Sequence, residues 1–118
     1  MAIAQAPAIV RRYLDAIVKR DWELLASVLA ADVVREGPYG DNFEGREPYV
    51  AFLRDTFAKL DGYEMNVARL WGTDDLACAE LTETVMVGGK TLRTDEAIVF
   101  EVAGETITRV RVFLQKSH

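Results

Sequence analysis

Two carboxylates in the second half of the chain, Glu80 and Asp95, combine residue types and spacing that suit proton transfer. Gly88-Gly89 lies between two strand-like runs and predicts a two-residue hairpin turn. That turn places Asp95 opposite Thr82 and diagonal to Glu80 on one face, with Arg69 approaching from the preceding strand. Two carboxylates in a half-apolar cavity compete for charge, which favours one protonated acid and one ionised base. The alternative is a solvated salt-bridge network that adds little stability.

The elements that must position these residues fall into two groups. Apolar residues recur at helical spacing from Ile9 to Val18, Asp21 is the expected N-cap of a short second helix, and a third helix runs from about Glu47 until Gly62 closes it. The second half is typical of an antiparallel meander, with strands over 63–71, 76–87, 91–102 and 106–114. Three helices followed by a meander predict an α+β domain in which helices pack on one face of a curved, mainly antiparallel sheet.

Side-chain alternation leaves two ways to orient this sheet. One face is mainly apolar, with Glu83, Thr94 and Glu96 as exceptions, and the other is mixed. The apolar face carries Ala77, Ala79, Leu81, Val85, Leu92, Ile98, Phe100 and Val102, and the mixed face carries Cys78, Glu80, Thr82, Thr84, Met86, Arg93, Asp95, Ala97 and Val99, joined by Tyr63, Met65, Val67, Arg69 and Trp71. A sheet covered on one side usually turns its apolar face to the helices, whereas aromatics interleaved with charges also suit a ligand cavity. Periodicity alone does not choose between them.

Length, charge and cysteine content narrow the class of protein. The 118 residues are enough for one domain, which we place over residues 1–118, and the net charge of -5 with scattered Lys and Arg disfavours nucleic acid or an anionic membrane as partner. The single cysteine, Cys78, excludes an internal disulfide, and the only histidine is His118, so we expect no histidine-based metal site or triad. No signal-peptide pattern or stretch of about 20 apolar residues is present, and we expect a cytoplasmic protein.

Several segments, in their order and spacing, resemble the SnoaL-like and ketosteroid isomerase-like branch of the nuclear transport factor 2-like superfamily. They are Ile9 to Leu14, Asp21-Trp22, Ala31 to Val33, Glu36 to Gly40, Gly45 to Glu47 and Ile107 to Phe113. The resemblance covers roughly residues 8–115. It implies a cone-shaped fold with a ligand pocket on the concave side of the sheet, and a homodimer formed through the outer sheet face.

The same resemblance implies that the mixed face lines the pocket. On this interpretation the ligand-binding positions are Tyr39, Tyr63, Arg69, Trp71, Thr82, Thr84, Met86, Val110 and Val112. For Tyr39, Tyr63 and Trp71 the alternative is core packing. Phe100 and Ile98 would then lie against a second subunit, and Glu83 and Glu96 would form interchain pairs with Arg109 or Arg111.

Catalytic residues carry over from the resemblance unevenly. Tyr13 matches the tyrosine that polarises the carbonyl in the isomerases, with a core tyrosine whose hydroxyl is satisfied as the alternative. The position of the isomerase base falls on Gly37. Glu36 and Asp41 flank that position and are candidate substitutes. Limonene epoxide hydrolases need carboxylates or an arginine at positions that fall on Thr84, Met86 and Val112, so the resemblance argues against that mechanism.

Two functions remain open from the sequence. The first is a pocket that binds a small, partly apolar metabolite and catalyses cofactor-independent isomerisation, cyclisation or dehydration. Tyr13 would polarise a carbonyl and Glu80 or Asp95 would move the proton. The second is a non-catalytic ligand carrier or dimerisation domain with the same cone.

Overall fold

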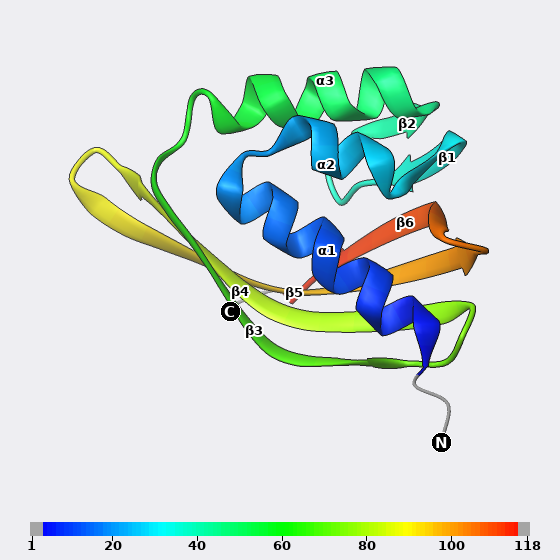
Figure 1. Cartoon of the computed structure of the whole chain (residues 1–118). Coiled ribbons are helices and arrows are strands. Elements are labelled where there is room, and N and C mark those ends of the chain that lie inside the picture. The colour runs from blue at the N-terminus through cyan, green and yellow to red at the C-terminus, as the bar shows by residue number, and fades with distance from the viewer. Residues whose placement is uncertain (1–3, 116–118) are drawn as a thin grey trace.

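The computed structural model describes residues 4–115, which form three helices and six strands (Figure 1); His118 lies outside these residues. In chain order the elements are α1 (Gln5–Lys19), α2 (Trp22–Ser27), β1 (Leu29–Glu36), β2 (Asn42–Glu44), α3 (Arg46–Phe57), β3 (Asp61–Gly72), β4 (Leu76–Val87), β5 (Lys90–Ala103) and β6 (Thr106–Leu114). The predicted α+β class is confirmed. Within the described part of the chain, none of the helices has the length and apolar character needed to cross a membrane.

The six strands form one sheet in the order β2-β1-β6-β5-β4-β3, in which β1 and β6 run parallel and the other neighbours antiparallel. Figure 1 shows the sheet curving around α1, with α2 and α3 beyond α1 on the same side. The Gly88-Gly89 turn joins β4 to β5 and pairs Thr82 with Asp95 and Leu81 with Glu96, as its two-residue length predicts.

Helix boundaries follow local chemistry. The α1 helix ends where Arg20 adopts a left-handed conformation with φ of 56°, and the backbone N–H of Leu24 donates to Asp21 Oδ1 at 3.1 Å, which confirms Asp21 as the N-cap of α2. The prediction that Gly62 closes α3 is wrong, because α3 ends at Phe57 and Gly62 lies in β3. Gly62 has φ of 61°, and a Cβ there would lie 2.7 Å from the Met86 side chain.

The apolar face of the sheet, and not the mixed face, turns toward the helices. Phe100 is fully buried with its ring edge-on to Tyr13 at a centroid distance of 5.2 Å, and Ile98 is buried in the same core. The expectation that Phe100 and Ile98 lie against a second subunit is therefore wrong. Burying such side chains contributes about 1.5–3 kcal/mol each, so the helices cover the face that has most apolar area to bury.

A β-bulge divides β3 between the two faces. Val67 pairs with Leu81 and Arg69 with Glu80, so one extra residue enters β3 between them. Tyr63 therefore points to the concave side, whereas Arg69 and Trp71 point to the convex side. A strict two-residue alternation predicts all three on one face, and the bulge is the reason that this prediction is wrong.

Candidate functional site

An interior pocket of about 270 Å³ lies on the concave face of the sheet, beneath α1 and α3. Most of its wall is apolar, with Leu14, Ile17, Phe52, Leu53, Phe57 and Met65 among the lining residues. Nine residues with polar or charged side chains also line it: Tyr13, Arg35, Tyr39, Asp41, Thr56, Tyr63, Glu83, Thr94 and Glu96. A few convergent polar groups in an apolar cavity are typical of a small-molecule site.

Glu83 on β4 and Glu96 on β5 form an acid pair in this pocket. The hairpin register pairs Leu81 with Glu96 and Glu83 with Thr94, so the two glutamates are diagonal neighbours on the concave face. Burial, a hydrogen bond with Glu83 and the charge of Glu83 raise the pKa of Glu96 to about 9, an effect that the Arg35 charge opposes. Glu96 therefore keeps its proton at neutral pH.

Tyr63 on β3 is hydrogen-bonded to Glu83, the other member of the pair. Its hydroxyl donates a hydrogen bond to Glu83 Oε2. Burial and then the negative charge of Glu83 raise the pKa of Tyr63, so this hydroxyl remains a donor at physiological pH. Glu83 thus accepts hydrogen bonds from both Tyr63 and Glu96, which stabilises its carboxylate in an apolar cavity.

A second polar chain runs along the opposite part of the pocket, through Arg35 on β1, Tyr49 on α3 and Tyr13 on α1. Arg35 Nη1 donates to the Tyr49 hydroxyl at 3.3 Å, and the hydroxyls of Tyr49 and Tyr13 are hydrogen-bonded to each other. Burial raises the pKa of both tyrosines, so both hydroxyls stay protonated. If Tyr49 accepts from Arg35 and donates to Tyr13, the Tyr13 hydrogen is left to donate to a ligand oxygen in the pocket.

Asp41, in the loop between β1 and β2, is the last member of this series of hydrogen bonds. Its Oδ2 accepts from Arg35 Nη2 at 2.9 Å and from Arg35 Nε at 3.2 Å. Although burial raises the pKa of Asp41, the hydrogen bonds from Arg35 and from the Tyr39 backbone lower it overall. Of the two candidates flanking Gly37, Asp41 thus faces the pocket, whereas Glu36 pairs with Arg109 and Arg111 on the sheet.

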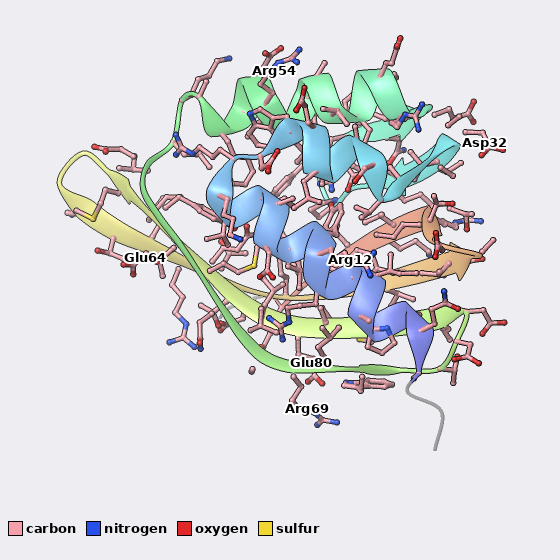
Figure 2. The ribbon with its side chains drawn as sticks, in the orientation of Figure 1. Arg12, Asp32, Arg54, Glu64, Arg69 and Glu80 are labelled. Carbon is pink, nitrogen blue, oxygen red and sulfur yellow. The ribbon has the colours of Figure 1, made fainter. Side chains whose placement is uncertain are left out.

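The structure contradicts the pocket placement predicted for Glu80 and Asp95. Both lie on the outer face of the sheet with side chains 41% exposed, and Figure 2 shows Arg69 and Glu80 on the side of the sheet away from the helices. Glu80 accepts from Trp71 Nε1 at 3.0 Å and pairs with Arg69, while Asp95 accepts from Thr82 and Arg93. Those two hydrogen bonds lower the pKa of Asp95. The solvated network is the alternative that the structure supports.

The remaining predicted ligand positions divide between the two faces. Tyr13, Tyr63 and Val112 line the pocket, Tyr39 stands at its mouth with 81% exposure, and Val110 is buried in the core. The pocket placement is wrong for the five positions on the outer face, which are Arg69, Trp71, Thr82, Thr84 and Met86. Because Thr84 and Met86 point away from the pocket, the argument from them against epoxide hydrolysis no longer applies.

Glu83 and Glu96 are pocket residues that the sequence interpretation assigned to interchain pairs. Arg109 and Arg111, the expected partners, instead contact Glu36, and Arg109 also lies near Glu101. A usable signal was present, since Glu83, Thr94 and Glu96 are the polar interruptions on an otherwise apolar face. Among residues 4–115, no group of three or more histidine, cysteine, aspartate or glutamate side chains is arranged to hold a metal ion.

The fold and the pocket define a cone-shaped α+β protein with an acid pair in its pocket. The profile of the SnoaL-like domain matches residues 10–110, and the chain belongs to the SnoaL-like family, whose nuclear transport factor 2-like fold it shares. No curated protein sequence matches it.

Three solved structures illustrate the likeness. An epoxide hydrolase of the limonene epoxide hydrolase-like type from M. tuberculosis is 23% identical with a TM-score of 0.82, over 93% of this chain and 82% of that chain. A putative ketosteroid isomerase from Kribbella flavida is 26% identical with a TM-score of 0.77, over 95% and 78%. A putative polyketide cyclase from Xanthomonas campestris pv. campestris is 20% identical with a TM-score of 0.76, over 92% and 88%.

Proposed function

We propose that this protein is a cofactor-independent acid–base enzyme that moves a proton on a small, partly apolar metabolite held in the interior pocket. The observation that carries the proposal is the Glu83–Glu96 pair, two neighbouring carboxyl groups in a mainly apolar pocket, of which Glu96 has its pKa raised to about 9. Such a pair supplies a general base and a general acid to one ligand. Isomerisation, cyclisation and dehydration all use this proton transfer, and Glu83 and Glu96 take the role that the sequence suggested for Glu80 and Asp95.

Glu83 is the proposed base. Its carboxylate takes a proton from a carbon next to a ligand carbonyl, so that the C–H bond breaks, an O–H bond forms on Glu83, and the electron pair moves to the carbonyl oxygen as an enolate. Glu96 is the proposed acid, because its raised pKa keeps it protonated at neutral pH. Returning a proton to a different carbon or to a leaving oxygen completes an isomerisation or an elimination.

Tyr13 is the proposed partner of the ligand oxygen. When Tyr49 accepts from Arg35 and donates to Tyr13, the guanidinium polarises both hydroxyls and leaves Tyr13 as a charge-assisted donor to the ligand. A donor held in place before the reaction stabilises an enolate oxygen more than it stabilises the neutral carbonyl. Membership of the SnoaL-like family and the likeness to a putative ketosteroid isomerase support this class of chemistry.

The test is exchange of the benzylic hydrogens of phenylacetone in D₂O, followed by NMR. We expect the protein to accelerate exchange, and Glu83→Gln to slow it about 100-fold or more, since general-base catalysis contributes roughly 10²–10⁴-fold. Glu64→Gln, which removes an exposed carboxylate from β3, is the matched control and should exchange at the wild-type rate. Saturable phenylacetone binding without accelerated exchange would instead favour the non-catalytic carrier.

We also propose that a second copy of the chain packs on the outer face of the sheet. Trp71 and Phe113 lie on this convex face with exposures of 49% and 48%. Two large aromatic side chains among paired charges resemble the mixed composition of a protein interface. Sedimentation of the purified protein tests this proposal, with a dimer mass expected.

A further inference from the structure

The Arg35 guanidinium is a largely buried cation in the wall of the interior pocket. Its side chain is 11% exposed, and its Cζ lies 5.4 Å from the ring centroids of both Tyr49 and Phe52. A guanidinium in such surroundings requires an anionic partner, because the aromatic rings replace only part of its hydration. The identity of that partner therefore determines which ligands the pocket accepts.

Asp41 is that partner, but it accepts only some of the hydrogen bonds that the guanidinium can donate. Both Arg35 bonds end on a single oxygen, Oδ2, whereas Oδ1 accepts from the backbone N–H of Tyr39 at 3.0 Å. A matched carboxylate would engage the guanidinium with both oxygens. A guanidinium has five N–H bonds, and only three have acceptors among residues 4–115, two on Asp41 and one on Tyr49.

Asp41 reaches Arg35 only because its loop folds back over Gly37. A Cβ at Gly37 would lie 2.1 Å from Asp41 Oδ2, so the carboxylate occupies the space that any other residue would fill. The same loop contributes Pro38 and Tyr39 to the mouth of the pocket. The Asp41 carboxylate therefore ties this loop to Arg35 in the pocket wall.

We propose that Arg35 is a carboxylate subsite of the pocket, and that Asp41 occupies it until the carboxylate of a substrate takes its place. The substrate class is a small monocarboxylate with an apolar body, of a size that fits about 270 Å³. An anion entering beside Asp41 would add charge to a cavity that already holds the Glu83 carboxylate. Exchange with Asp41 leaves the charge of the pocket unchanged, and it frees the loop at the mouth.

This inference rests on the proposed function, because it places the ligand in the same pocket. It adds the direction in which the ligand lies there. With its carboxylate on Arg35, the apolar body of the ligand extends along the aromatic wall toward Glu83 and Glu96. The substrate would therefore carry its carboxylate at one end and its reacting carbon at the other.

The experiment is calorimetric titration of the full chain with phenylacetate and with phenylacetamide, a neutral ligand of the same shape, at pH 7 and constant ionic strength. Asp41→Asn should bind phenylacetate about tenfold or more tighter than the wild type, because removing an occupant raises the fraction of binding-competent protein. Phenylacetamide should change less than about threefold. Asp32→Asn, an exposed substitution on the same strand as Arg35, is the control and should bind both ligands as the wild type does.

A second variant keeps every charge. Gly37→Ala should push Asp41 off Arg35 and strengthen phenylacetate binding in the same direction, and adding Arg35→Gln to Asp41→Asn should abolish the preference for phenylacetate. Equal or weaker phenylacetate binding in Asp41→Asn and Gly37→Ala, absent binding to Asp41→Asn, or an equal gain for phenylacetamide would overturn the subsite. The phenylacetone exchange test depends on Glu83 and uses no carboxylate ligand, so its failure is distinguishable from failure of the subsite.

Discussion

Substitution of Glu96 by glutamine should remove a large part of the pH dependence of stability. The folded protein keeps the Glu96 proton up to pH about 9, whereas in the unfolded chain the group releases it near its ordinary pKa of 4.5. Between these values the folded state binds one more proton than the unfolded state. The free energy of unfolding therefore falls as pH rises, by about 1.4 kcal/mol per pH unit.

The expected magnitude follows from that slope. Between pH 5.5 and 7.5 this one site should lower the free energy of unfolding of the wild type by about 3 kcal/mol. For a domain of this size that loss corresponds to a fall of roughly 10 °C in Tm. Glu96→Gln keeps a neutral side chain that can donate to Glu83, so the variant should lack this fall in the free energy of unfolding between pH 5.5 and 7.5.

Urea unfolding at pH 5.5, 6.5 and 7.5 measures the effect as the difference between the two proteins. The wild type and Glu96→Gln should diverge steadily as pH rises, with the variant the more stable at pH 7.5. Glu64→Gln, which removes a carboxylate from an exposed position on β3, should follow the wild type. Parallel curves for the wild type and Glu96→Gln would refute the shared proton and the acid role built on it.

Three further substitutions test other parts of the structure. Tyr13→Phe should slow phenylacetone exchange about 10-fold to 100-fold while costing about 1 kcal/mol in urea unfolding, because Tyr49 keeps its bond from Arg35. Phe100→Ala should cost about 3–5 kcal/mol in the same assay, and a loss under about 1 kcal/mol would contradict its place in the core. Phe113→Glu on the outer face should convert a dimer to monomers in sedimentation with little change in stability; an unchanged mass would place the interface elsewhere.

Features that depend on neighbouring residues could be predicted from the sequence. The Gly88-Gly89 turn set the pairing of Thr82 with Asp95, because a two-residue loop allows one register. Asp21 caps α2 through a hydrogen bond to a residue three positions away. The resemblance of ordered segments was enough to identify the SnoaL-like family.

The site itself depended on information that local patterns do not contain. One extra residue in β3 sends Arg69 and Trp71 to the face opposite Tyr63, and nothing in the alternation of that strand marks the bulge. The choice of face for the whole sheet depends on which side buries more apolar area under α1, a comparison between segments far apart in the chain. Local patterns therefore place Glu80 and Asp95 in the pocket, whereas the structure places Glu83 and Glu96 there.

The surroundings of Arg35 are the clearest example of a feature that local sequence patterns do not predict. Its environment combines Asp41 from a loop, Tyr49 and Phe52 from α3, and Tyr13 from α1 through Tyr49. Local spacing was sufficient for the helices, the hairpin and the chemical types of the side chains. Which carboxylates share a proton, and which cation faces them, depended on the curvature of the sheet and the packing of α1 and α3, because burial is a property of the assembled layers and not of any one segment.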